Sequence, residues 1–236
     1  MHLARATLAL LCLCSAGTAV AGSLSITPVR LNLSAGRTAG VLTLVNHDSE
    51  PTLVQVDVAR WFQINGADSL EPTRELLATP PIFTVPAGGS QIVRVGLRGA
   101  VPAGPQEVSY RLLLKEVPPA LTASTQGVKI SLNISLPVFV GPAMPAGGAP
   151  VLRWQARLVD GGLLLRADND GPLHVQVTGL RLAGGEPLPR FVTGYVLPGA
   201  YREWTVRHDA AAGSLLPLIA STDAGELVTQ VPVAAP

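Results

Sequence analysis

The chain has 236 residues, of which 47% are hydrophobic, 14% charged and 4% aromatic, and its formal net charge is +1. This is enough apolar material for a packed core and excludes a disordered chain, although glycine and proline are frequent. The basic residues form no block or stripe, so we expect no nucleic-acid partner.

The first residues, 1–21, are typical of a secretory signal peptide. Arg5 precedes a short apolar run at 6–13, and residues 19–21 (Ala-Val-Ala) supply a small-x-small cleavage site. The run is too short to cross a bilayer, and no later segment offers the about 20 apolar residues that a spanning helix needs. We therefore expect cleavage near Ala21 and a mature protein without membrane insertion.

Cysteine occurs only at Cys12 and Cys14, both inside this signal. The mature chain thus has no thiol, which rules out a disulfide, a cysteine-ligated metal and a cysteine nucleophile. Cleavage also removes Arg5 and leaves equal numbers of acidic and basic residues. The mature protein has to rely on its hydrophobic core for stability.

Apolar and polar residues alternate along the first half, and turn residues interrupt them at short intervals. This pattern predicts an all-β sandwich. The predicted strands lie at 41–45, 53–58 with Trp61 and Phe62 beyond it, 92–97 and 110–114. The one helix that we predict is a short piece at 74–77.

Residues 143–150 are small, uncharged and rich in glycine and proline, which predicts a linker. It divides the chain into an N-terminal domain at 22–142 and a C-terminal domain at 151–236, each long enough for an immunoglobulin-like sandwich. Strands of the second domain are predicted at 163–165, 175–182, 201–206 and 215–221. We interpret residues 168–171 (Asp-Asn-Asp-Gly) as a hairpin turn, since no glutamate follows at the distance that a calcium loop requires.

The segment 128–140 alternates most regularly. Its apolar positions are Val128, Ile130, Leu132, Ile134, Leu136, Val138 and Val140. Since successive side chains of a strand point to opposite faces, these residues form one continuous aliphatic row, longer than a typical strand of five or six residues needs. Two interpretations stay open: an ordinary half-buried strand, or a strand that offers part of its row to a partner.

Enzymatic chemistry has no support in the sequence. His47, His174 and His208 stand far apart, and there is no HExxH, GxSxG or glycine-rich phosphate loop. We expect no catalytic activity, no cofactor and no metal.

Several short motifs occur together in the order and spacing of a known family. They are Ser25-Ile26-Thr27-Pro28-Val29-Arg30, Ala78-Thr79-Pro80-Pro81, Val85-Pro86-Ala87-Gly88, Tyr110 to Leu114 followed by Lys115-Glu116-Val117-Pro118-Pro119, Leu197-Pro198-Gly199 and Asp223-Ala224-Gly225. With the alternating segment 128–140, they resemble the periplasmic chaperones of the chaperone–usher pathway, which assembles bacterial pili. The resemblance covers essentially the whole mature chain.

The resemblance implies two immunoglobulin-like domains in an L-shaped arrangement, a cleft between them and a periplasmic location. It also implies a function: such chaperones donate a β-strand to pilus subunits whose immunoglobulin fold is incomplete, and deliver them to an outer-membrane usher. The donor strand would present Val128, Ile130, Leu132 and Ile134.

The resemblance assigns roles to further residues. Arg30 matches the cleft arginine that anchors the C-terminal carboxylate of the subunit. Arg94 is our second choice for this role, because it lies in a strand expected to face the same cleft. The peptide bond between Thr79 and Pro80 matches one that is cis in the family.

Two positions depart from the better-known branch of the family. Pro137 stands where that branch has a lysine that assists the arginine, and residues 136–140 (Leu-Pro-Val-Phe-Val) resemble the archaic branch, which includes spore-coat-type and biofilm pilus chaperones. Gly141 stands where an inter-domain salt bridge would need an arginine, with Glu107 and Asp223 as its acidic partners.

An alternative is a secreted structural or adhesive immunoglobulin-like protein, or a pilus subunit itself. A subunit would carry a long N-terminal extension and usually one incomplete domain, whereas here the strand at 26–33 follows almost directly after the signal. Purification separates the two, because a chaperone should be a soluble monomer and an isolated subunit should aggregate.

Overall fold

The computed structural model describes residues 24–118, 131–142, 152–182, 188 and 193–236, and every regular element within them is a β-strand. The predicted signal at 1–21 and the predicted linker at 143–150 lie outside the described residues, as do Val128 and Ile130. No helix among the described residues is long and apolar enough to cross a membrane.

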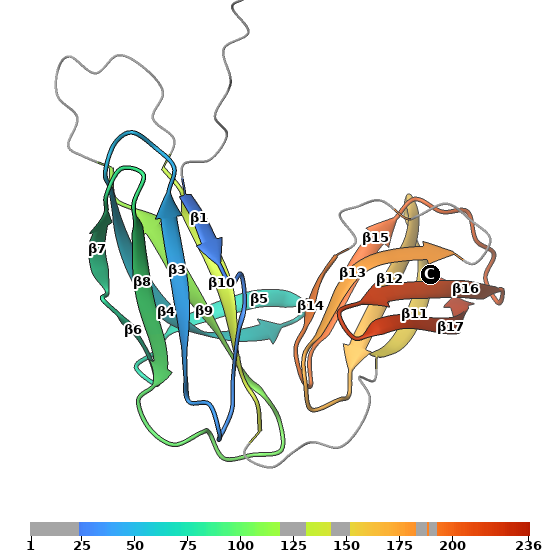
Figure 1. Ribbon diagram of the computed structural model, residues 1–236. Coiled ribbons are helices and arrows are strands. Elements are labelled where there is room, and N and C mark those ends of the chain that lie inside the picture. The colour runs from blue at the N-terminus through green and yellow to red at the C-terminus, as the bar shows by residue number, and fades with distance from the viewer. Residues whose placement is uncertain (1–23, 119–130, 143–151, 183–187, 189–192) are drawn as a thin grey trace, which may run out of the picture.

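The first half is a sandwich of two sheets (Figure 1). Its strands are β1 (Leu24–Thr27), β2 (Leu31–Leu33), β3 (Ala39–Asn46), β4 (Thr52–Ile64), β5 (Ala67–Pro72), β6 (Leu76–Thr79), β7 (Ile82–Val85), β8 (Ser90–Leu97), β9 (Val108–Glu116) and β10 (Asn133–Val140). One sheet has the order β1-β3-β8-β6; the other has the order β2-β10-β9-β4-β5, with β7 paired to β4.

Alternation explains which residues these two sheets bury. Along β3 and β8 every second side chain points inward, and the same holds for β9, so the two inner faces enclose one core. Its members with no measurable exposure include Leu42, Leu44, Val93, Val95, Tyr110, Leu112 and Val138.

The predicted helix at 74–77 is wrong. Leu76 and Leu77 begin strand β6, which pairs with β8. Leu76 is buried in the core while Leu77 is exposed, so the segment has the period of a strand. The Glu75 N–H group donates to Thr73 Oγ1, which forms a tight turn whose residues look like a helix start in the sequence.

The second half forms a seven-stranded sheet that curves around its own core. Its strands are β11 (Leu152–Val159), β12 (Gly162–Asn169), β13 (Val175–Leu182), β14 (Gly194–Val196), β15 (Tyr201–Val206), β16 (Leu215–Thr222) and β17 (Gly225–Ala234), in the order β14-β13-β16-β17-β11-β12-β15. The core contains the stacked rings of Trp154 and Trp204. All four strands predicted for this half are present.

The β4–β5 hairpin reaches from the first half to the second (Figure 1). Asn65 and Gly66 form its tight turn with φ values of 52° and 76°, which asparagine and glycine tolerate best. A Cβ on Gly66 would lie 3.1 Å from the ring of Tyr201 in the second half, so the tip is closely packed. The hairpin therefore helps to fix the angle between the halves.

Candidate functional site

Strand β10 is fully paired along one edge and only partly paired along the other. Along its first edge it pairs with β9 over its whole length, from Asn133 to Val140. Along its second, outer edge it pairs with β2 only at Val138–Val140. Among the described residues, the stretch 133–137 therefore has a free backbone edge, which can accept a further strand.

The backbone groups at this edge follow from the ladder. The Leu132 carbonyl accepts a hydrogen bond from the Glu116 N–H group, so by alternation the amides of Asn133 and Ser135 point outward. The next outward position is Pro137, which has no N–H group. A proline is tolerated in a sheet where its missing donor would face an open edge, which explains its presence in β10.

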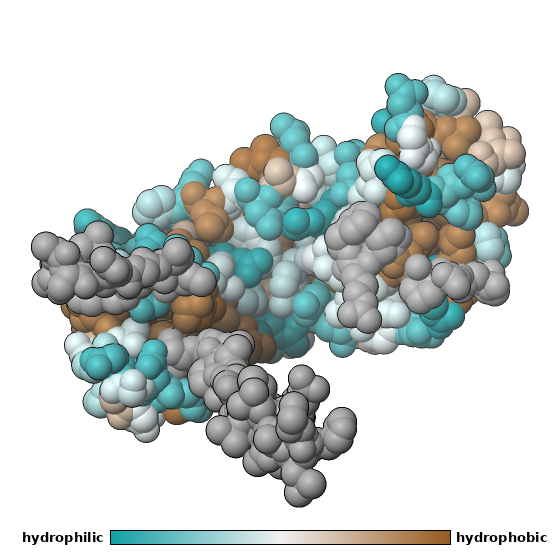
Figure 2. Space-filling model, turned by 90° about the horizontal axis from the view of Figure 1, so that it is seen from above, coloured by the Kyte–Doolittle hydropathy of each residue, from teal (hydrophilic) through white to brown (hydrophobic). Residues whose placement is uncertain are grey.

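The aliphatic row of β10 passes out of the core toward this edge. Leu136, Val138 and Val140 are buried in the core of the first half, whereas Ile134 is half-buried against it. A hollow of about 210 Å³ opens beside Ile134, lined by Leu113, Leu114, Lys115, Asn133, Ile134 and Ser135. Figure 2 shows apolar surface at this end of the molecule, viewed from above.

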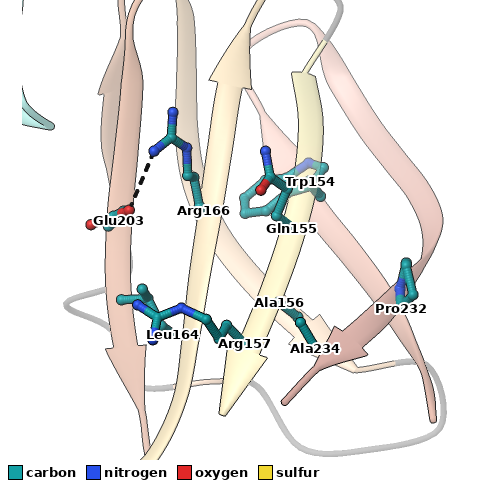
Figure 3. A pocket seen from close by; sticks show the side chains of 9 residues that line it. All are labelled: Trp154, Gln155, Ala156, Arg157, Leu164, Arg166, Glu203, Pro232 and Ala234. Atoms are coloured by element: carbon teal, nitrogen blue, oxygen red, sulfur yellow. Dashed lines mark ion pairs between the residues drawn. The ribbon is translucent and has the colours of Figure 1, made fainter. Parts of the chain in front are cut away.

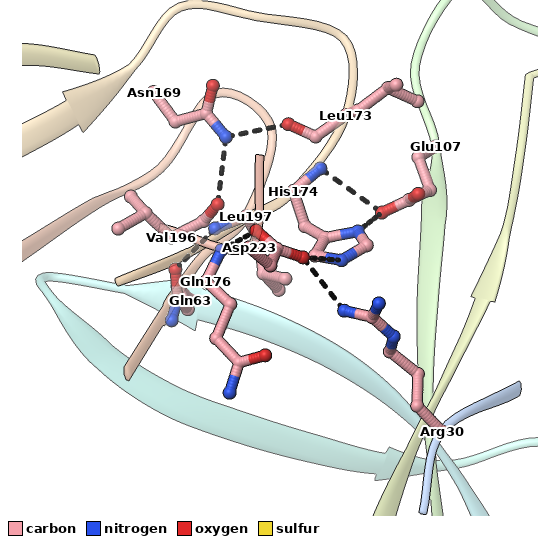
Figure 4. A network of polar contacts seen from close by, with 10 residues as sticks. All are labelled: Arg30, Gln63, Glu107, Asn169, Leu173, His174, Gln176, Val196, Leu197 and Asp223. Carbon is pink, nitrogen blue, oxygen red and sulfur yellow. Dashed lines mark hydrogen bonds and ion pairs between the residues drawn. The ribbon is translucent and has the colours of Figure 1, made fainter. Parts of the chain in front are cut away.

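Arg30 lies where the free edge ends. It directly precedes Leu31, whose partner in β10 is Val138, and so it stands beside Pro137. Its Nη1 atom donates a hydrogen bond to Asp223 Oδ2 in the second half, at 2.8 Å (Figure 4). The side chains of Arg30 and Asp223 are 33% and 22% exposed, so the pair lies at the border of solvent.

His174 lies between the two acidic residues of the cleft, Glu107 and Asp223. Its Nδ1 atom lies 2.7 Å from Glu107 Oε1 in the first half, and its Nε2 atom lies 3.6 Å from Asp223 Oδ2 (Figure 4). Its ring stacks on Phe139 of β10 with a centroid separation of 3.5 Å. The missing arginine at Gly141 is thus replaced by a histidine from the other half, which sequence reasoning missed.

A buried asparagine positions His174. Asn169 at the end of β12 donates to the carbonyl groups of Leu173 and Val196, and its Oδ1 atom accepts from the Gly171 N–H group. These bonds fix the loop from β12 to β13 that carries His174. The prediction of a hairpin turn at 168–171 is wrong, because β12 pairs with β11 and β15 whereas β13 pairs with β14 and β16, so the two strands are not neighbours.

Further contacts between the halves surround this network. Gln63 in β4 bonds with the Tyr195 carbonyl and the Leu197 N–H group, and Asp68 in β5 pairs with Arg202 at 3.2 Å. Burial alone would raise the pKa of Asp68, but the hydrogen bonds that it accepts and the charge of Arg202 outweigh burial and lower it. Trp61, Phe139 and Leu197 form a small apolar cluster beside these polar contacts.

Arg111 is a second arginine on this side of the sheet, and sequence reasoning did not find it. It is the direct partner of Pro137 between β9 and β10. Its guanidinium carbon lies 3.6 Å from the centroid of the Trp61 ring and 5.6 Å from that of Tyr195. Burial lowers the pKa of this guanidinium, and among the described residues no carboxylate lies within ion-pair distance.

Arg94, our second choice for the cleft, lies elsewhere. It belongs to β8, in the other sheet, where it pairs with Val41 and Thr79 and is exposed. The expectation failed because inward and outward faces alternate along a strand, and Arg94 falls on the outward face between the buried residues Val93 and Val95. The Thr79–Pro80 bond next to it is cis, as is Thr27–Pro28.

A separate hollow of about 430 Å³ lies on the second half (Figure 3), and it is lined by Trp154, Gln155, Ala156, Arg157, Leu164, Arg166, Glu203, Pro232 and Ala234. Of its charged side chains, Arg166 pairs with Asp168 outside the lining at 2.7 Å and with Glu203 at 3.6 Å. Within the described residues, no group of three or more histidine, cysteine or acidic side chains could hold a metal ion.

Comparisons with known proteins agree on one family. The family model described as "Pili and flagellar-assembly chaperone, PapD N-terminal domain" matches residues 23–145. The chaperone protein FaeE of Escherichia coli is 29% identical over 136 residues, which cover 58% of this chain and 49% of FaeE. The match thus spans about half the length of that relative.

Solved structures show the same fold over nearly the whole chain. The complex of CsuC with the tip subunit CsuE, from archaic Csu pili of Acinetobacter baumannii, gives a TM-score of 0.69 at 22% identity and covers 91% of this chain and 100% of that chain. The complex of the SafA pilin with the SafB chaperone of Salmonella enterica gives 0.64 at 23% identity, with 88% and 96% covered. The Escherichia coli chaperone DraB gives 0.61 at 20% identity, with 89% and 96% covered.

Proposed function

This chain belongs to the family of pili and flagellar-assembly chaperones, and on that premise we propose that it binds pilus subunits in the periplasm by adding strand β10 to their incomplete fold. The observation that carries this proposal is the free edge at 133–137 together with the aliphatic row that leaves the core there. An added strand would complete its backbone ladder on this edge, while the aliphatic side chains would fill a groove of the subunit.

The energetics of such a contact are favourable. We propose that the donor residues are Val128, Ile130, Leu132 and Ile134, which continue the row of β10. At about 1.5–3 kcal/mol for each aliphatic side chain removed from water, four residues contribute roughly 6–12 kcal/mol before the cost of ordering the partners. A subunit that lacks a strand exposes the matching groove and an unpaired edge, so capping both also prevents its aggregation.

Arg30 sets the direction and register of the added strand. Because β2 occupies the outer side of β10 from Val138 onward, a strand added along 133–137 ends beside Arg30. A guanidinium attracts a terminal carboxylate and repels a terminal ammonium group, so the C-terminus of the added strand belongs at this end. The added strand therefore runs parallel to β10, and Arg30 anchors its carboxylate.

Arg111 takes the place of Arg94 as the second basic residue in this proposal. It lies in the sheet next to Pro137, the position at which the better-known branch has a lysine, and it adds positive charge to the same face of the sheet. The segment 136–140 (Leu-Pro-Val-Phe-Val) supports placing the chain in the archaic branch. Delivery to an outer-membrane usher and export by the signal at 1–21 complete the proposed role.

Co-expression tests this function. The protein is produced in a bacterial periplasm together with the pilus subunits encoded beside it, and soluble subunit is measured after affinity purification. We expect a soluble complex with at least one subunit and an aggregated subunit in its absence. Equal amounts of soluble subunit with and without the protein would contradict the proposal.

A further inference from the structure

The guanidinium of Arg30 already has a carboxylate partner in the free protein. Its Nη1 atom binds Asp223 Oδ2 at 2.8 Å, and this is its one ion pair among the described residues (Figure 4). The partner belongs to the other half of the molecule, 193 positions away along the chain. The proposed function assigns the Arg30 guanidinium to the terminal carboxylate of a ligand, but in the free protein Asp223 already binds this guanidinium.

Asp223 is the fixed member of this pair. Its Oδ1 atom accepts a hydrogen bond from the Gln176 N–H group at 2.9 Å, and its own N–H group donates to the Gln176 carbonyl at 3.0 Å. Its Oδ2 atom also lies 3.6 Å from His174 Nε2, which is buried and has no hydrogen-bond partner among the described residues. Arg30, in contrast, has a long side chain whose one hydrogen bond to a described residue is the bond to Asp223, so a change of partner moves Arg30.

We propose that Asp223 is an internal competitor for Arg30, which keeps the anchor occupied until the terminal carboxylate of a ligand replaces it. This inference rests on the proposed function, because it takes Arg30 as the anchor. Two carboxylates that share one guanidinium repel each other, so Asp223 weakens carboxylate binding whether the ligand displaces it or binds beside it. Asp223 thus sets how tightly, and how selectively, the cleft holds a chain terminus.

A titration with small probes tests the inference without a subunit. The probes are N-acetyl-leucine, which has a free carboxylate, and N-acetyl-leucinamide, which has the same shape without the charge. The readout is the side-chain Nε–Hε signal of Arg30 in the ¹⁵N-labelled full-length mature protein at low ionic strength. The variants are Asp223→Asn and the matched control Asp68→Asn, which removes another ion pair between the halves, the one with Arg202.

We expect Asp223→Asn to bind N-acetyl-leucine about two- to fivefold more tightly than the wild type, the factor expected for losing a competing, partly exposed ion pair. Asp68→Asn should bind it like the wild type, and the amide should shift the signal in no variant. In an Arg30→Ala background, followed through the Trp61 indole signal, Asp223→Asn should make no difference to the affinity.

Three results would overturn the inference: equal affinity in the wild type and Asp223→Asn, weaker binding in Asp223→Asn, or no acid-specific shift in Asp223→Asn. Weaker binding would mean that Asp223 orients Arg30. Because the titration contains no subunit, it gives its answer even if the protein fails to hold subunits in the co-expression experiment. Recovery of soluble subunit with wild type and Asp223→Asn reports on the proposed function separately.

Discussion

Single side chains from opposite halves meet in pairs across the cleft. Arg30 meets Asp223, Glu107 meets His174, and Asp68 meets Arg202. Three of these residues, Arg30, Glu107 and Asp223, were identified from the sequence, because they stand in recognisable motifs. His174 was not, since a lone histidine in a loop belongs to no pattern, and its role depends on two carboxylates that are distant in the sequence.

Replacing Arg30 by alanine should abolish recovery of a soluble subunit complex. Leaving a buried carboxylate without its partner costs about 2–5 kcal/mol of binding, which is roughly 30-fold or more in affinity. The melting temperature should hardly change, because the partly exposed pair with Asp223 contributes only about 0.2–1 kcal/mol. Arg94→Ala, on the far sheet, is the control. Undiminished recovery with Arg30→Ala would falsify the anchor role.

Asp68 should make the contact between the halves sensitive to acid. Because its pKa is lowered in the folded protein, its stabilisation is present above the pKa of an unfolded aspartate and is lost as the pH falls through the folded value. Wild type should therefore be more stable than Asp68→Asn at pH 7, and the difference should shrink as the pH falls below about 4, the pKa of an unfolded aspartate. Thermal melts across this range measure it; a difference that is independent of pH would contradict the assignment.

At the scale of elements, the aliphatic row of β10 has two roles. Its buried part packs in the core, and the part that leaves the core is proposed to bind the subunit. Within the described residues, periodicity predicted the row correctly from Ile134 to Val140, but it could not tell where the row leaves the core. Periodicity reports which residues share a face, whereas the length of the free edge depends on how far β2 extends along β10. The same limit explains the error at 74–77, where a local turn at Thr73 resembled a helix start and pairing with β8 decided for a strand.

Substitutions along the row should separate its role in subunit binding from its role in the stability of the fold. Ile130→Ser with Leu132→Ser should leave the protein folded and abolish subunit binding. Leu136→Ala, in the same row but only 7% exposed, should reduce the free energy of unfolding by about 2–5 kcal/mol. Ile92→Ser, at an exposed aliphatic residue of β8, is the control for both. Chemical denaturation and subunit recovery measure the outcome; wild-type recovery with the double variant would show that another surface binds the subunit.

At the scale of the whole molecule, two sandwiches are joined by the β4–β5 hairpin, an aromatic cluster and the polar network of the cleft. Alternation and turn residues were sufficient to predict the all-β class and most strands. The packing of the halves was predicted only through the family resemblance, because contacts such as Phe139 on His174 leave no trace in local periodicity. The free edge of β10 likewise appears only when the sheet order is known.

Amide hydrogen exchange at this edge tests strand donation most directly. NMR of the free protein and of its complex with a pilus subunit gives the exchange rates of the Asn133 and Ser135 amides, which point outward from β10. The account predicts that both amides exchange rapidly in the free protein and are strongly protected in the complex, because they then donate to the added strand. A stable complex in which both amides still exchange at their free rates would contradict strand donation by β10.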